Sequence, residues 1–118
     1  MFGLSAYVWN INYNLALAKA VKIAYPNCLI LMGGPGVPDK DTMYLKKYSF
    51  IDICVHKEGE LAFTELLLGT DPYTIPGLSF LDKEGNTHYS TANSRIKKVD
   101  DIPSPYLLGL FDDIVTEA

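Results

Sequence analysis

The sequence is poor in the features that mark nucleic-acid-binding, membrane and secreted proteins. It has 10 Lys and Arg against 14 Asp and Glu, a net charge of −4 and a pI near 5.0. Because nucleic-acid binding depends on clustered basic residues that neutralise phosphates, this balance argues against such a partner. No apolar run approaches the ~20 residues of a membrane span, and the N-terminus has no signal-peptide pattern.

Cysteine is scarce as well. Cys28 and Cys54 each lie in an apolar run typical of a strand. Since free cysteine is commonly buried as a small apolar side chain, a packing role is favoured for both. Neither has the spacing to a second cysteine or to histidine that a metal site requires, so no metal ligand is predicted. These absences indicate a cytoplasmic protein.

What the sequence does contain is an apolar strand that ends in glycines. Five apolar residues, Cys28–Met32, run directly into Gly33-Gly34-Pro35-Gly36. Such a run, closed by turn residues, is typical of a strand buried on both faces of a parallel sheet. Ligands of these sheets bind at the carboxyl ends of the strands, where glycine permits close approach. We therefore expect this loop to form one wall of a binding site.

Strands and helices alternate along residues 1–69, which predicts an α/β fold with parallel strands and right-handed crossovers. The expected strands are Phe2–Trp9, Cys28–Met32 and Ile51–Val55, and the expected helices lie near residues 15–25, 39–48 and 60–68. The first helix is expected to begin at a cap on Asn12 or Asn14 and to bury Leu17, Ala20, Val21 and Ala24, with Lys22 facing away. The last helix is expected to bury Phe63, Leu66 and Leu67 and to end at Gly69.

The pattern changes after Gly69. Two short apolar runs, Gly77–Leu81 and Thr87–Ser90, flank a turn-forming segment and predict a β-hairpin. Residues 95–118 are polar and then proline-rich, as in a connector. We expect residues 1–70 to form a partial Rossmann-like domain and residues 71–118 to form the hairpin and a linker.

The strand Phe2–Trp9 would be the edge of a thin sheet if nothing preceded it. Sheets commonly hold ~4–6 strands, and a long apolar edge promotes pairing between chains. We therefore expect an N-terminally truncated sheet. Its uncovered edge is expected to favour a homo-oligomer of the isolated chain.

The glycine loop lacks the neighbours of three familiar motifs. No Lys-Ser or Lys-Thr follows it, as a Walker A loop requires, and no third glycine opens a helix, as a dinucleotide fingerprint requires. It resembles the GGPG turn of glutamine amidotransferases. However, Cys54 has no flanking glycines to make a nucleophile elbow, and His88 does not begin an H-x-E pair. A tight turn that binds no ligand remains an alternative interpretation of this loop.

Three further positions lie at predicted strand ends. His56 begins H-x-x-G, as in the cobalt-binding D-x-H-x-x-G motif, but Cys54 replaces the aspartate, so His56 is interpreted as a strand-end residue. Gly59 stands between two acids where a helix begins, which suggests a polar contact to a ligand beyond the effect of the helix dipole. Trp9 has two interpretations, a core side chain or a flat wall for a planar ligand.

Taken in order, five stretches resemble the cobalamin-binding domain of cobalamin-dependent radical SAM enzymes. They are Gly3–Asn10, Gly33-Gly34-Pro35, Glu58-Gly59-Glu60, Ile75-Pro76-Gly77-Leu78-Ser79 and Asp101-Ile102-Pro103-Ser104-Pro105-Tyr106. The resemblance covers nearly the whole chain. It implies a Rossmann-like, flavodoxin-type three-layer sandwich, with the corrin over the carboxyl ends of the strands and the nucleotide tail beside the sheet.

The resemblance also implies the residues that contact cobalamin, which are Ser5, Tyr7, Trp9, Asn10, Gly33, Gly34, Pro35, Glu58, Gly59 and Glu60. No catalytic side chain is expected, because the cofactor carries the chemistry. The cobalt of this family usually lacks a lower histidine ligand, in agreement with the missing D-x-H-x-x-G motif.

Two parts of the family pattern are absent from the chain. The family domain normally begins with two further strands, and its C-x-x-x-C-x-x-C motif belongs to the next domain. The resemblance therefore implies a downstream radical SAM domain with S-adenosylmethionine and a 4Fe-4S cluster, and a parent enzyme that transfers methyl or related groups. No catalysis is expected from this chain alone. The alternative is a non-enzymatic Rossmann-like ligand-binding or sensory module.

Overall fold

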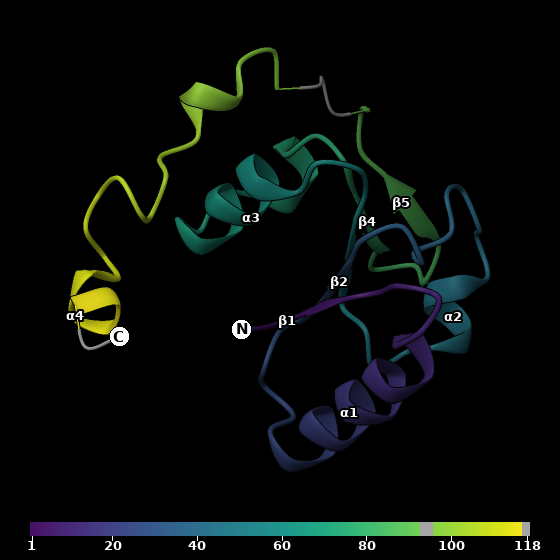
Figure 1. Cartoon of the computed structure of the whole chain (residues 1–118). Helices are drawn as coiled ribbons and strands as arrows, with labels where there is room; N and C mark the ends of the chain where they lie inside the picture. Colours follow the sequence, from purple (N-terminus) through teal and green to yellow (C-terminus); the bar gives the residue numbers. More distant parts are fainter. Residues whose placement is uncertain (93–95, 117–118) are drawn as a thin grey trace.

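The computed structural model describes residues 1–92 and 96–116, and its middle layer is a single sheet (Figure 1). Five strands follow in the order of the chain: β1 (Phe2–Ser5), β2 (Ile30–Gly33), β3 (Ile53–Val55), β4 (Leu78–Leu81) and β5 (Thr87–Tyr89). The first three strands are parallel, and β4 and β5 are antiparallel to their neighbours. The predicted α/β class is confirmed. The predicted hairpin also forms, and it extends the parallel sheet.

Helices cover both faces of this sheet. Helices α1 (Ile11–Ala24) and α2 (Tyr44–Lys47) lie on one face, and α3 (Glu60–Leu67) lies on the other (Figure 1). Alternate residues of β2 enter different cores, because side chains along a strand point to opposite faces. Ile30 and Met32 pack toward α1 and α2, whereas Leu31 packs toward α3. The prediction that this strand is buried on both faces is confirmed.

Helix α1 starts earlier and buries a different stripe than the sequence predicts. It begins at Ile11, and its buried residues are Asn14 and Ala18, whereas Ala20 and Ala24 are exposed. The reason is a polar contact: Asn14 Nδ2 donates a 2.6 Å hydrogen bond to the backbone oxygen at the end of β1. A hydropathy pattern does not assign an asparagine to the buried face, so it favoured a neighbouring stripe.

Lys22 does not face away from the protein, as predicted. Its Nζ lies 2.8 Å from Asp52 Oδ2 and 2.9 Å from the carbonyl oxygen of Cys28. The same Asp52 oxygen accepts a 2.6 Å hydrogen bond from the backbone N–H of Ile30. The end of α1 is thereby joined to the starts of β2 and β3, at the edge opposite the glycine loop.

Several boundaries differ from the prediction. β1 ends at Ser5 instead of Trp9, because residues 7–10 form a turn in which the Asn10 N–H bonds the Tyr7 carbonyl. In α3, Ala62 and Leu66 are buried while Phe63 and Leu67 are exposed, because the helix meets the sheet along one narrow line. Gly69 ends this helix with a φ of +80°, as predicted.

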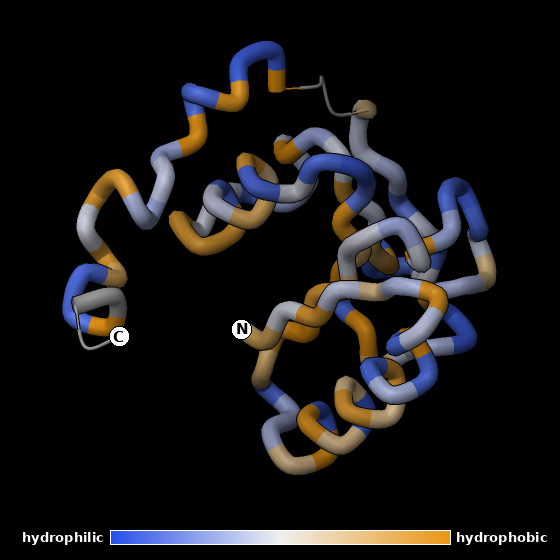
Figure 2. The backbone as a smooth tube through the Cα atoms, in the orientation of Figure 1, coloured by the Kyte–Doolittle hydropathy of each residue, from blue (hydrophilic) through white to orange (hydrophobic). Residues whose placement is uncertain are grey.

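The C-terminal segment contributes little to the core. It contains one 3-10 turn, Val99–Asp101, and the short helix α4 (Asp112–Thr116). Figure 2 shows hydrophobic positions along this segment away from the sheet, and the exposed ones include Leu107, Leu108, Leu110 and Ile114. Arg95 and residues 117–118, at the limits of the predicted connector, lie outside the described residues. Within the described ranges, no helix has the length and apolarity to cross a membrane.

The Lys22–Asp52 contact gives a stability prediction. We expect Asp52→Ala to lower the free energy of unfolding by about 1–3 kcal/mol, because it removes the ion pair and leaves the Ile30 N–H without its acceptor. The exposed Asp100→Ala variant is the control and should change it by no more than about 0.5 kcal/mol. Urea denaturation followed by circular dichroism measures both. Equal stabilities of the two variants would show that the contact is not structural.

Candidate functional site

The ten predicted contact residues all lie at one edge of the sheet. They come from the ends of β1, β2 and β3, from the loops that follow them or from the first residue of α3, and parallel strands bring these ends together. The structure does not gather them into one pocket. Eight of them border a slot on the α3 face, an aromatic surface or a recess beside the glycine loop, and Asn10 and Glu58 line none of these three.

The slot is a depression of about 440 Å³ on the α3 face of β1 and β2, and it contains four of the predicted residues. We use this name for the space lined by Gly3, Ser5, Gly33, Gly59, Glu60 and Phe63. Gly3 and Ser5 face it because they alternate with the core residues Phe2 and Leu4. Ser5 pairs in register with Gly33, so two small residues lie side by side on its floor.

Small residues are what keep the slot open. A Cβ atom at Gly3 would lie 3.8 Å from the Phe63 ring, and a Cβ atom at Gly33 would lie 3.5 Å from the Val55 carbonyl oxygen. Both distances are ordinary van der Waals contacts, so a Cβ atom would fit at either position. A larger side chain there would occupy the slot. Gly59 differs, because a Cβ atom there would lie 2.9 Å from Val55 Cγ1. It is required for the approach of α3 to β3.

Packing within the protein also explains why the loop after β2 contains glycines. The N–H of Ala6 bonds the Gly33 carbonyl at 2.6 Å, and the N–H of Gly36 bonds the Ala6 carbonyl at 2.7 Å. Gly34 has a φ of +97°, and a Cβ atom at Gly34 or Gly36 would lie 2.9 Å from the Ala6 oxygen. These two glycines therefore permit a close backbone approach. A direct contact of Gly34 with a ligand stays a prediction.

Tyr7 and Trp9 form an exposed aromatic shelf beside this loop. Their rings stack with centroids 4.7 Å apart and an interplanar angle of 14°. Trp9 is 77% exposed, so the core interpretation of this residue is wrong. The pair borders a recess that also includes Pro35. Asn10 supports the turn, since its Oδ1 accepts a 2.8 Å hydrogen bond from the Tyr7 N–H.

The two predicted glutamates have different surroundings. Glu60 is the first residue of α3 and lies at the slot, where its carboxylate is also favoured by the positive end of the helix dipole. Glu58 does not line the slot. Its Oε2 accepts a 2.8 Å hydrogen bond from the N–H of Ile96 and so joins the β3–α3 loop to the C-terminal segment.

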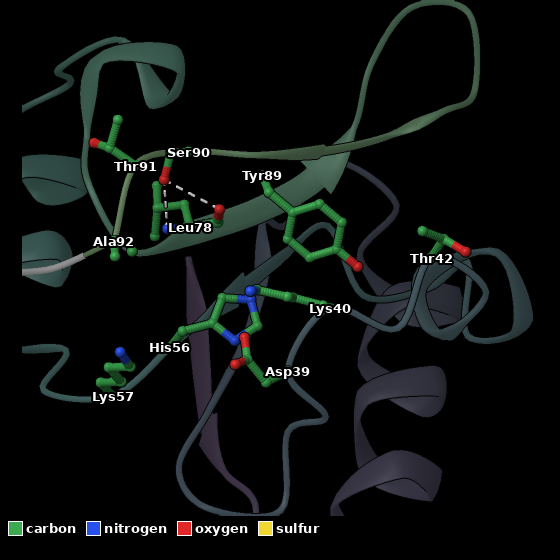
Figure 3. A pocket seen from close by; sticks show the side chains of 11 residues that line it. Asp39, Lys40, Thr42, His56, Lys57, Leu78, Tyr89, Ser90, Thr91 and Ala92 are labelled. Atoms are coloured by element: carbon green, nitrogen blue, oxygen red, sulfur yellow. Dashed lines mark hydrogen bonds between the residues drawn. The ribbon is translucent and has the colours of Figure 1, made fainter.

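His56 is the site residue that the sequence argument set aside. Its Nε2 lies 2.8 Å from the hydroxyl of Ser79, which is buried on β4. The His56 side chain lines two recesses, one of which is shown in Figure 3. Burial lowers the pKa of His56 below its ordinary 6.5, against an opposing effect of Asp39. The pairing with Ser79 could not be read from the sequence, because 23 positions separate the two residues.

The buried thiol of Cys54 is not suited to act as a nucleophile. Cys54 is 1% exposed, and burial raises the pKa of its thiol to about 12. A thiol that stays protonated and inaccessible is inert as a nucleophile. Among the residues the structure describes, no three His, Cys, Asp or Glu side chains are placed to hold a metal ion. What the edge presents is a slot, a flat aromatic surface and polar groups, which are features for binding.

Comparison with known proteins shows which enzymes this chain resembles in sequence. The chain is 41% identical over 120 residues to the cobalamin-dependent radical SAM methyltransferase TokK of Streptomyces tokunonensis. It is 38% identical over 120 residues to the 2-(S-pantetheinyl)-carbapenam-3-carboxylate methyltransferase of Streptantibioticus cattleyicolor. Each match covers 98% of this chain and 18% of the relative. No family model matches the chain.

A solved structure supports the same relationship at the level of the fold. The cobalamin-dependent S-adenosylmethionine radical enzyme OxsB matches with a TM-score of 0.62 at 19% identity, over 92% of this chain and 16% of that one. The chain is thus an α/β unit equivalent to one segment of much longer enzymes. Over nearly its whole length the chain is similar to one segment of cobalamin-dependent radical SAM methyltransferases, and the resemblance predicted from the sequence is confirmed.

The close approach at Ala6 predicts a contrast between two glycines. Gly34 and Gly69 both have positive φ, but a Cβ atom meets the Ala6 oxygen only at Gly34 and has open space at Gly69. We expect Gly34→Ala to destabilise the fold by about 1–3 kcal/mol more than Gly69→Ala, since overpacking adds to the shared backbone cost. Thermal unfolding of both variants measures this difference. Equal losses would show that the loop tolerates the methyl group.

The burial of His56 predicts a dependence of stability on pH. Because its pKa is lower in the folded protein, the unfolded chain binds the proton more readily. The contribution of His56 to stability is therefore intact above pH 6.5 and decreases as the pH falls from 6.5 toward the folded pKa. NMR titration of the His56 ring should show a midpoint below 6.5, and His56→Gln should reduce the loss of stability. A midpoint at or above 6.5 would contradict this account.

Proposed function

We propose that this chain binds cobalamin at the carboxyl edge of β1, β2 and β3, with the corrin over the edge and the nucleotide tail in the slot. The slot is the observation that carries the proposal. Four positions on its walls bear a glycine or a serine, namely Gly3, Ser5, Gly33 and Gly59. A flat heteroaromatic base can enter a space that side chains would otherwise fill. The descriptions of TokK and OxsB as cobalamin-dependent support the same cofactor.

The residues present fit the two parts of this cofactor. Ser5 places a hydroxyl in the slot, and Glu60 places a carboxylate at the same space, where they can bond the polar groups of a nucleotide. The aromatic shelf of Tyr7 and Trp9 lies beside Pro35 and presents a flat apolar face. Such a face suits a large planar ring, whose many carboxamides then need polar partners around it.

The role of the whole protein follows as a further proposal. Bound cobalamin would supply the group-transfer chemistry, with S-adenosylmethionine and a 4Fe-4S cluster held by a radical SAM domain in the same polypeptide. The protein would then be a methyltransferase or a related group transferase in the cytoplasm. Residues 71–118 would contain the hairpin and the linker toward that domain. The exposed β1 edge would be covered by further chain or by a second copy.

Titration with hydroxocobalamin tests the binding proposal. The purified gene product that contains this chain should shift the corrin absorption bands with a saturable dependence on protein concentration. Ser5→Leu should weaken binding by about tenfold or more, because the added side chain fills the slot. Asn12→Leu is the control, since it also places a leucine at an exposed polar position, in α1 and outside the slot.

Three results would contradict the proposal or redirect it. An unshifted corrin spectrum at high protein concentration would show that the chain does not bind cobalamin. Equal weakening by Ser5→Leu and Asn12→Leu would show that the slot is not where the cofactor enters. Normal binding by a gene product without any radical SAM domain would favour the alternative, a non-enzymatic ligand-binding module.

A further inference from the structure

A second cavity lies on the other side of the strand ends, outside the slot and the aromatic shelf. It has a volume of about 620 Å³ and lies where β3, the β4–β5 hairpin and the loop before α2 meet (Figure 3). We call it the His56 recess and define it by Asp39, Lys40, His56, Lys57 and Tyr89. None of these residues is among the predicted cofactor contacts.

The His56 recess adjoins the glycine loop. The smaller recess beside Gly34 and Pro35 shares Asp39, His56 and Lys57 with it. A ligand that lies over the strand ends therefore passes directly from the proposed corrin position to this cavity. Because a corrin is wide and carries carboxamide arms around its rim, an arm reaching beyond the edge of β3 would enter here.

The walls of the His56 recess are held in place by hydrogen bonds. His56 Nε2 is bonded to Ser79 Oγ at 2.8 Å, and the Thr87 hydroxyl donates to the Thr42 carbonyl at 2.8 Å. The second bond joins the loop before α2 to β5. The cavity thus exists before a ligand arrives, and a ligand group would enter a space of fixed shape.

Two lysines beside the cavity have unusual backbone conformations. Lys40 has a φ of +58° and Lys57 a φ of +60°, and they are the two non-glycine residues with positive φ in the described part of the chain. Such a conformation is strained for a residue with a side chain. Strain of this kind gathers at functional sites, where the surrounding structure maintains it.

The His56 recess presents two groups that can bond the two ends of a carboxamide. The Tyr89 hydroxyl is buried without a hydrogen-bond partner among the described residues, so a ligand group in the recess can bond it. Asp39 lines the same recess, and its carboxylate can accept a hydrogen bond from an N–H group. A carboxamide suits this pair, because its carbonyl accepts a hydrogen bond and its NH₂ donates one to a carboxylate.

We propose that the His56 recess binds a carboxamide arm of the corrin rim, with the amide N–H donating to Asp39 and the amide carbonyl accepting from Tyr89. This inference rests on the proposed function, since it assumes that cobalamin is the ligand. It assigns a role to Asp39 and Tyr89 that is separate from the slot. The arm would also fix the rotation of the corrin ring about the axis that passes through its metal.

Charge-altered cobalamins test this assignment. Mild hydrolysis converts single rim carboxamides to carboxylates, and the separated monocarboxylates are titrated into the purified gene product beside hydroxocobalamin. One isomer should bind about tenfold or more weakly than cobalamin, because its carboxylate meets Asp39. Asp39→Asn should remove most of that discrimination and should weaken cobalamin itself by about fivefold or less, because the asparagine oxygen still accepts the amide N–H. Asp100→Asn, an exposed carboxylate on the C-terminal segment, is the control and should leave the discrimination unchanged.

A second variant tests the other hydrogen bond. Tyr89→Phe keeps the ring and removes the hydroxyl, which has no partner to lose among the described residues, so the fold is not expected to weaken. Its affinity for cobalamin should fall by about fivefold, the value of one hydrogen bond.

The outcomes separate this inference from the function on which it rests. Cobalamin binding without any discrimination that depends on Asp39, or without loss in Tyr89→Phe, overturns the carboxamide site and leaves the proposed function standing. Failure of the gene product to bind cobalamin overturns both. Discrimination against one isomer that disappears in Asp39→Asn supports the assignment.

Discussion

Two backbone hydrogen bonds at Ala6 determine how the ligand edge of this protein is built. The Ala6 N–H bonds the Gly33 carbonyl, and the Ala6 carbonyl accepts from Gly36, so the chain after β2 turns back onto the end of β1. This approach is possible because Gly34 and Gly36 carry no Cβ atoms. With Ala6 fully buried beneath the loop, the chain leaves the sheet directly after it, and Trp9 is placed on the surface. The position of the aromatic shelf follows from this one constraint.

The opposite end of the sheet is held differently. There, the Lys22–Asp52 ion pair and the bond from Asp52 to the Ile30 N–H join α1 to the starts of the strands. The face of the sheet that α3 covers stays partly open, because the buried residues of this helix are Ala62 and Leu66. The part of the sheet that this helix leaves open is the slot. The fold thus combines a rigid frame with an open ligand edge, as suits a protein whose chemistry would be supplied by a bound cofactor.

Much of the frame was predictable from the sequence, because it depends on local patterns. The apolar run Cys28–Met32, the turn before Thr87 and the glycine after α3 each led to the correct element. The errors arose where long-range polar contacts decide the structure. Asn14 is buried by a bond to the Ser5 carbonyl, and Lys22 is half-buried through its contact with Asp52. No hydropathy pattern contains these partners, since they are distant along the chain.

The candidate site was predictable in part. The predicted residues lie at one edge, because parallel strands place their ends together. Their separation into a slot and a shelf depends on the three-dimensional path of the chain after each strand. The sequence suggested a ligand role for the whole glycine loop, whereas the structure gives Gly34 a packing reason of its own. His56 was set aside because the cobalt motif around it is incomplete. Its place beside Asp39 and Tyr89 depends on three separate segments of the chain.

The central claim is that the slot receives the nucleotide tail of cobalamin. Cobinamide, which has the corrin but lacks this tail, tests the claim most directly when its dissociation constant is compared with that of cobalamin on the same protein. The account predicts that cobalamin binds at least about tenfold more tightly than cobinamide, and that Ser5→Leu abolishes this advantage. Equal affinities of the unmodified protein for cobalamin and cobinamide would contradict it.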